Sequence, residues 1–131
     1  MSNIIHIFIV VKNVSIKEIV DRYTSDKFLL DFNKIIPIPD DVYMGDLTPE
    51  TELEYPNNWY TWATEHWGTH SNANACTIAM SGKDVVLEFY TLSAPSFPII
   101  KQISEDFKTT VKVSYKSELD KKSKVITIRS L

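Results

Sequence analysis

Two histidines and the single cysteine of this chain come closest to a metal-binding pattern. His66 and His70 are four residues apart, so on one helix they would project from adjacent turns, and Cys76 could supply a third zinc ligand. Gly68 lies between the histidines and is expected to end that helix, which separates the two side chains. No Cys-x-x-Cys pair accompanies them. We therefore expect no metal and no cofactor.

The other reactive residue types lack the neighbours that catalysis requires. Cys76 as a nucleophile would need a base and an electropositive niche, but it lies in an apolar alternation typical of a strand. The three glycines are scattered singly, which excludes a glycine-rich phosphate loop. The paired carboxylates Asp40 and Asp41 lie in a polar segment, where a pKa shift useful for acid–base catalysis is not expected. We predict no catalytic residues and expect that the protein is not an enzyme.

Aromatic residues and charge are both distributed unevenly. Residues 57–70 hold all three tryptophans, and burying one such ring removes about 150–250 Å² from water, so this segment either anchors the core or presents a contact surface. Residues 35–82 contain seven acids and no lysine or arginine, whereas residues 101–131 contain eight basic and four acidic residues. A region of one sign steers partners of the other sign, although a solvated acidic loop is the simpler interpretation.

Periodicity predicts the elements that position these residues. Residues 4–11 are almost continuously apolar, as in a central strand, and Ser15 with Glu18 forms a capping-box pattern that opens a helix. An alternation over residues 27–36 predicts a second strand. The rest is predicted as a polar loop (40–56), a short helix capped by Asn57 or Asn58, a hairpin (76–92), a helix from about residue 96, and strands near 111–115 and 125–129.

This order predicts an α+β protein of the ferredoxin-like sandwich type. Such a fold has a mostly antiparallel sheet with two main helices on one face, here with a short inserted Trp-rich helix. We expect a single domain over residues 1–131, with the acidic loop and the Trp-rich helix as an insertion at about 37–74. No apolar run approaches the roughly 20 residues that cross a bilayer, and one cysteine excludes an internal disulfide. We therefore expect a cytoplasmic protein with no membrane contact.

Three ordered motifs resemble those of a known family. They are Phe-Asn-Lys-Ile-Ile-Pro-Ile-Pro at residues 32–39, Trp59-Tyr60 followed by Trp67-Gly68-Thr69, and Phe-Tyr-Thr-Leu-Ser-Ala-Pro at residues 89–95. Together, over about residues 28–107, they are similar to the YubB-type ferredoxin-like domain of small phage and plasmid proteins, a family without an established function. Members usually continue with a Lys-Trp pair where this chain has His70-Ser71. The resemblance implies the fold and a mobile-element origin, and it implies no catalytic residues.

The acidic residues lie next to the Trp-rich segment in the sequence. This combination predicts a non-enzymatic protein that binds a macromolecular partner. The predicted partner-binding residues are Asp40, Asp41, Asp46, Glu50, Glu52, Glu54, Trp59, Tyr60 and Trp67. With the phage-like resemblance, we expect the partner to be a host nucleic-acid enzyme whose basic groove accepts these acids in place of phosphates. The most specific hypothesis is an anti-defence, anti-CRISPR-like inhibitor.

Other interpretations stay open. A small-ligand or nucleotide binder would use the tryptophans as a stacking pocket. A nucleic-acid-binding module would use sheet aromatics and a basic edge formed by Lys112, Lys116, Lys121, Lys122 and Lys124. The net charge of −3 and the lack of a Lys/Arg-Gly-Phe/Tyr strand argue against direct nucleic-acid binding.

A homodimer through the uncovered sheet face has no sequence signature. The spacing of the tryptophans does not distinguish those that fill the core from those that reach the surface.

Overall fold

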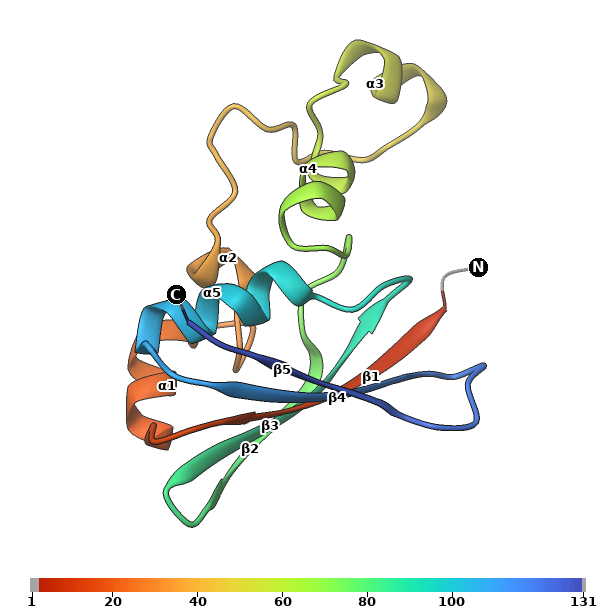
Figure 1. Cartoon of the computed structure of the whole chain (residues 1–131). Helices are drawn as coiled ribbons and strands as arrows, with labels where there is room; N and C mark the ends of the chain where they lie inside the picture. The colour runs from red at the N-terminus through yellow and green to blue at the C-terminus, as the bar shows by residue number, and fades with distance from the viewer. Residues whose placement is uncertain (1–2, 131) are drawn as a thin grey trace.

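Five antiparallel strands form one sheet in a computed structural model that describes residues 3–130 (Figure 1). The strands follow the order β2-β3-β1-β4-β5 across the sheet. Their bounds are β1 Ile4–Val11, β2 Asn74–Ser81, β3 Asp84–Leu92, β4 Val111–Ser117 and β5 Lys124–Ile128. The helices are α1 Ile16–Tyr23, α2 Phe32–Ile35, α3 Pro49–Glu54, α4 Trp59–His66 and α5 Phe97–Phe107.

The connections confirm the predicted α+β, ferredoxin-like class. The chain passes from β1 through α1 to β2 and from β3 through α5 to β4, and β3 and β1 lie side by side in the centre of the sheet. The fifth strand, β5, extends the sheet beyond β4 and is an addition to the four-stranded pattern. No helix within residues 3–130 is long and apolar enough to cross a membrane.

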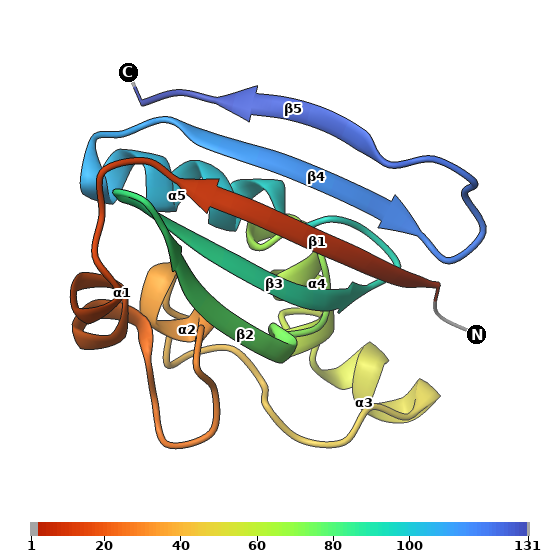
Figure 2. The ribbon, with the colours of Figure 1, turned by 90° about the horizontal axis from the view of Figure 1, so that it is seen from below.

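The helices lie on one face of the sheet, and the core fills the space between these two layers (Figure 2). Alternate side chains of the central strand, including Ile7 and Ile9, are fully buried under this layer. Tyr23 from α1 and Ile103 from α5 reach the same core. The opposite face of the sheet carries no helix from residues 3–130; we call it the free face.

Local capping explains where the helices begin and end. Ser15 and Glu18 form the predicted capping box at α1. The Asn58 side chain caps α4 by accepting a hydrogen bond from Thr61 N. After α4, Gly68 has φ of +81°, and a Cβ there would lie 2.8 Å from Cδ of Pro98. Glycine is therefore required by both the backbone turn and the close approach of the first turn of α5.

The strand predicted over residues 27–36 is wrong. This segment is irregular and ends in the short helix α2, where Asp31 caps the backbone by accepting from Asn33 N. Other backbone groups of the segment also have partners nearby in the chain, since Asp31 N donates to Tyr23 O and Leu29 O accepts from Thr24 Oγ1. Local hydrogen bonds of this kind compete with strand pairing. The apolar alternation records burial against the core, which an irregular segment achieves as well.

Candidate functional site

Residues 37–58, which we call the acidic arm, run away from the sheet and return at the start of α4 (Figure 1). Tyr43 and Tyr55 stack with ring centroids 4.1 Å apart and planes 2° apart, which joins the outgoing and returning halves. Tyr43 N donates to Asn57 O, and Trp59 N donates to Tyr43 O. The segment predicted as a polar loop over residues 40–56 thus contains a helix, α3. The contacts of Tyr43 hold the two ends of the segment together.

All six predicted carboxylates of the acidic arm are exposed to solvent, namely Asp40, Asp41, Asp46, Glu50, Glu52 and Glu54. None of them forms an ion pair with a residue in the described range 3–130, whereas Asp106 pairs with Arg22 and Asp84 with Lys12. The arm itself contains no lysine or arginine. It therefore concentrates negative charge that no described residue neutralises through an ion pair.

Four large apolar side chains are exposed on this arm or beside it. Leu53 is 87% exposed and Met44 60%, while Tyr55 and Tyr60 are exposed by 40% and 46%. Methionine and aromatic residues are enriched in the contact surfaces of protein complexes. Tyr60 was among the predicted contacts. Met44, Leu53 and Tyr55 were not, although each is an apolar or aromatic residue in a segment rich in acidic residues.

Two of the three tryptophans belong to the core. Trp62 and Trp67 are 8% and 5% exposed, and their rings meet edge to face. Trp67 also packs against Phe32, and its Nε1 donates to Ile36 O at 2.8 Å. The ring and the donor of Trp67 are both used inside the fold, so its burial gives no support to the prediction of Trp67 as a partner contact.

The third tryptophan connects the acidic arm to the helix layer. Trp59 is half-buried at the start of α4, and its Nε1 donates to Gly45 O at 3.0 Å. Tyr60, the next residue, stays exposed and stacks on His70 with centroids 4.7 Å apart. Of the predicted aromatic contacts, the structure thus brings Trp59 and Tyr60 to the base of the arm.

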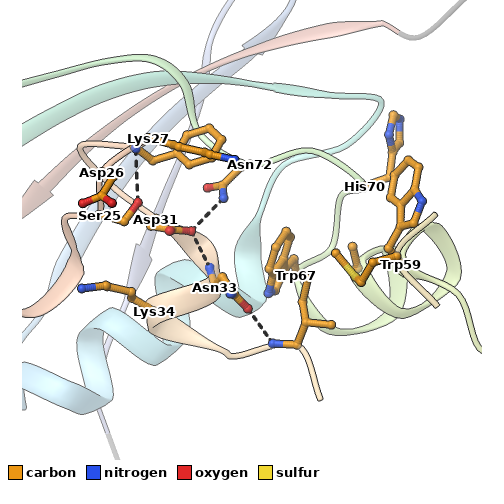
Figure 3. A pocket seen from close by; sticks show the side chains of 14 residues that line it. Ser25, Asp26, Lys27, Asp31, Asn33, Lys34, Trp59, Trp67, His70 and Asn72 are labelled. Atoms are coloured by element: carbon orange, nitrogen blue, oxygen red, sulfur yellow. Dashed lines mark hydrogen bonds between the residues drawn. The ribbon is translucent and has the colours of Figure 1, made fainter. Parts of the chain in front are cut away.

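A cavity of about 680 Å³ lies at the base of the acidic arm. Figure 3 shows Trp59 and His70 at one end, Trp67 in the middle, and Asp26 and Lys34 at the other end. The volume lies within the range of small-molecule sites, which are mostly apolar with a few polar groups. The sequence suggested only a stacking pocket of tryptophans. The other lining residues were not predicted, because they come from the segment after α1, from α2, from the arm, from α4 and from the loop that follows it.

Several polar groups of the cavity wall already bond to one another. Asp31 Oδ1 accepts from Asn72 Nδ2 and from Asn33 N, both at 2.9 Å. Asn72 Oδ1 in turn accepts from Phe32 N at 2.9 Å. These bonds fix the wall, whereas Lys34 and Lys27 at the polar end form no ion pair with a described residue and remain available as donors.

The residues of the hypothetical zinc pattern are not gathered into a metal-binding group within residues 3–130. His66 Nδ1 donates to Trp62 O at 2.8 Å, and its ring stacks on Trp62. His70 lies in the loop beyond α4. Cys76 lies on β2, where burial raises the pKa of its thiol to about 11. A raised pKa lowers the thiolate fraction, which is the opposite of what a nucleophilic cysteine needs.

Comparisons with known proteins add no relative. No family model matches the chain, and neither a curated protein nor a solved structure matches it. The YubB-type family therefore stays a prediction from the three sequence motifs, and the fold assignment depends on the structure alone.

Proposed function

We propose that this protein is not catalytic and acts by binding another protein through the acidic arm together with Tyr60. One observation carries the proposal. Six exposed carboxylates without an ion-pair partner in residues 3–130 lie on the same projecting segment as exposed Met44, Leu53 and Tyr55. Charge of one sign speeds encounter with an oppositely charged surface, and large apolar or aromatic side chains then supply most of the affinity.

A partner that fits this surface has a basic groove bordered by apolar pockets. Enzymes that act on nucleic acids carry such grooves, because lysine and arginine contact the phosphates. The arm's carboxylates would occupy positions otherwise taken by phosphates and so block the groove. Given the resemblance to phage and plasmid proteins, the most specific form of the proposal is an anti-defence, anti-CRISPR-like inhibitor of a host nucleic-acid enzyme in the cytoplasm.

The test is capture of partners from a bacterial host lysate with matched variants. The arm variant carries Asp→Asn and Glu→Gln at all six acids, which removes charge while keeping side-chain size. The control variant carries Asp26→Asn and Glu65→Gln, two exposed acids outside the acidic arm. We expect the wild type and the control to retain a basic nucleic-acid-binding protein that excess DNA or RNA displaces, and we expect the arm variant to lose it.

Two results would count against this function. Equal retention by the arm variant would show that the carboxylates do not steer binding. If the wild type captures no protein that nucleic acid can displace, the inhibitor form of the proposal fails as well.

The cavity supports a second candidate function, binding of a small planar ligand. Trp59 and Trp67 line the cavity of about 680 Å³, together with the free donors Lys27 and Lys34. A bound ring would change tryptophan fluorescence, so titration with mononucleotides tests this function directly. Quenching that saturates, and that Trp59→Leu abolishes, would favour the ligand; unchanged fluorescence up to about 1 mM would exclude it at the affinities typical of such sites.

A further inference from the structure

The free face of the sheet is turned toward the viewer in Figure 2. By strand alternation it carries the side chains that lie between the core residues. On β1 these include His6 and Phe8, and on β3 they include Tyr90. Phe8 and Tyr90 are each 37% exposed, and the side chain of His6 is exposed to the same extent. Three aromatic rings therefore lie on the two central strands of a surface that no helix covers.

Strand register arranges these side chains in rows across the sheet. Tyr90 lies opposite His6, and His6 lies opposite Lys116 on β4. The rings of His6 and Tyr90 have centroids 5.0 Å apart. These three side chains help to line a hollow of about 440 Å³. Four residues farther along β1 than His6, Val10 lies opposite Lys112 in another row.

We propose that the free face binds single-stranded nucleic acid. Unpaired bases stack on exposed aromatic side chains without sequence preference, and four-stranded sheets of RNA-binding domains present aromatics on their central strands in this way. Here His6, Phe8 and Tyr90 provide the stacking surface. Lys112 and Lys116 on the neighbouring strand provide the phosphate contacts.

The charges around the hollow are compatible with this ligand. Two carboxylates line it, but Glu88 Oε2 is 2.8 Å from His6 Nε2, and Glu118 Oε1 accepts a hydrogen bond from Ile4 N at 3.1 Å. Lys112 and Lys116 form no ion pair with a residue in the described part of the chain. The loop between β4 and β5 adds further lysines, Lys121 and Lys122.

One of the two sequence-based arguments against nucleic acid was the lack of a Lys/Arg-Gly-Phe/Tyr strand, which still holds. The other argument used the charge of the whole chain. That charge is dominated by the acidic arm, which lies beyond the helix layer and away from the free face (Figure 1). A second copy of the chain fits the face less well, since the cores of protein interfaces are depleted of charged residues. On this face Glu88 and Lys116 lie among the aromatic side chains.

Fluorescence anisotropy of labelled oligothymidylate and oligouridylate, each about 20 nucleotides long, tests this inference on the full chain. We expect binding in about 50 mM salt that weakens as salt is raised. Phe8→Leu keeps an apolar side chain and removes the ring, and Tyr90→Leu does the same on β3. Each should weaken binding about tenfold. Lys112→Glu with Lys116→Glu should weaken binding and flatten its salt dependence.

Matched controls lie on the other side of the molecule. Tyr60→Leu and Lys17→Glu should leave oligonucleotide affinity unchanged, and thermal melting checks that every variant is folded. The arm variant with its six acids neutralised should bind oligonucleotide at least as tightly as the wild type. The result of this experiment therefore does not depend on whether the acidic arm binds a protein partner.

Three results would overturn the inference. The first is no change in anisotropy with either oligonucleotide up to about 100 μM protein in low salt. The second is equal affinity for a duplex of the same length, which offers no unpaired bases. The third is a wild-type dimer in sedimentation that Phe8→Leu or Tyr90→Leu converts to a monomer, because the free face would then bind a second copy.

Discussion

The acidic arm and the free face lie on opposite sides of the helix layer and are built differently (Figures 1 and 2). The arm is one continuous segment, so its charge comes from residues that are neighbours in the sequence. The free face is assembled from strands far apart in the chain, as the pairing of His6 with Tyr90 shows. A surface of the first kind can be predicted from sequence, whereas a surface of the second kind exists only once strand register is known.

The largest expected effect distinguishes a core tryptophan from an exposed aromatic residue next to the acidic arm. Trp67→Ala should lower the free energy of unfolding by about 3–5 kcal/mol, because it removes a buried ring and leaves a cavity. Tyr60→Ala, on the exposed side of α4, should change it by less than about 0.5 kcal/mol. Urea denaturation followed by circular dichroism measures both. Similar losses for the two variants would contradict the division between core and surface.

A smaller effect is expected where the acidic arm joins the helix layer. Asn58 is 4% exposed; its Oδ1 accepts from Thr61 N and its Nδ2 donates to Tyr55 O. Asn58→Ala should therefore cost about 1–2 kcal/mol. Thr64→Ala, which removes an exposed side-chain bond to Tyr60 O, is the control.

Hydrogen exchange measured on the same two variants locates the effect. Asn58→Ala should speed exchange in the acidic arm and leave β1 and β3 unchanged. Faster exchange throughout the sheet would show that the arm and the sheet do not behave as separate regions.

Cysteine labelling compares the two faces of the sheet on one edge strand. Cys76 faces the core side, and burial raises the pKa of its thiol to about 11, whereas Thr77 is exposed on the free side. The thiolate is the reactive form, so labelling of Cys76 by iodoacetamide should keep rising with pH up to about 11. Thr77→Cys in a Cys76→Ser background should react at least about tenfold faster at pH 8 and level off near the ordinary pKa of about 8.5. Equal rates at pH 8 would show that the free face is not open.

The smallest effect concerns the stability of the acidic arm itself. Glu50 and Glu54 are four residues apart on α3, and like charges at this spacing repel across one helical turn. Glu54→Gln should therefore stabilise the fold by a few tenths of a kcal/mol. A stability loss above about 1 kcal/mol would mean that this carboxylate is engaged in the fold and is not free for a partner. Thermal melting at low salt detects the difference, and Glu65→Gln on α4 is the control.

Much of the fold was predictable because the spacing of apolar residues and the capping residues indicate the same secondary structure in each segment. The continuous apolar run of residues 4–11, the capping box at Ser15 and the hairpin predicted over residues 76–92 are confirmed as β1, the start of α1 and the pairing of β2 with β3. Residues 27–36 were mispredicted because Asp31 and Thr24 offer the backbone local partners, which no alternation of apolar residues reveals.

The candidate site was predictable in charge and only partly in its aromatic residues. The exposed acids were found because they form one run without a basic residue. The burial of Trp67 was not predicted, because its packing partner, Phe32, lies far away in the chain and apolar periodicity alone cannot reveal that contact. The cavity and the free face needed the tertiary structure, since each combines several separate segments.

Hydrogen exchange of the protein with and without its captured partner tests the central claim most directly. We expect the partner to slow exchange of the backbone amides in residues 40–60, with the amides of β1 and β3 unchanged. Glu→Gln and Asp→Asn at the six carboxylates should remove that protection. Protection confined to the sheet, with exchange across residues 40–60 unaltered, would contradict binding through the acidic arm.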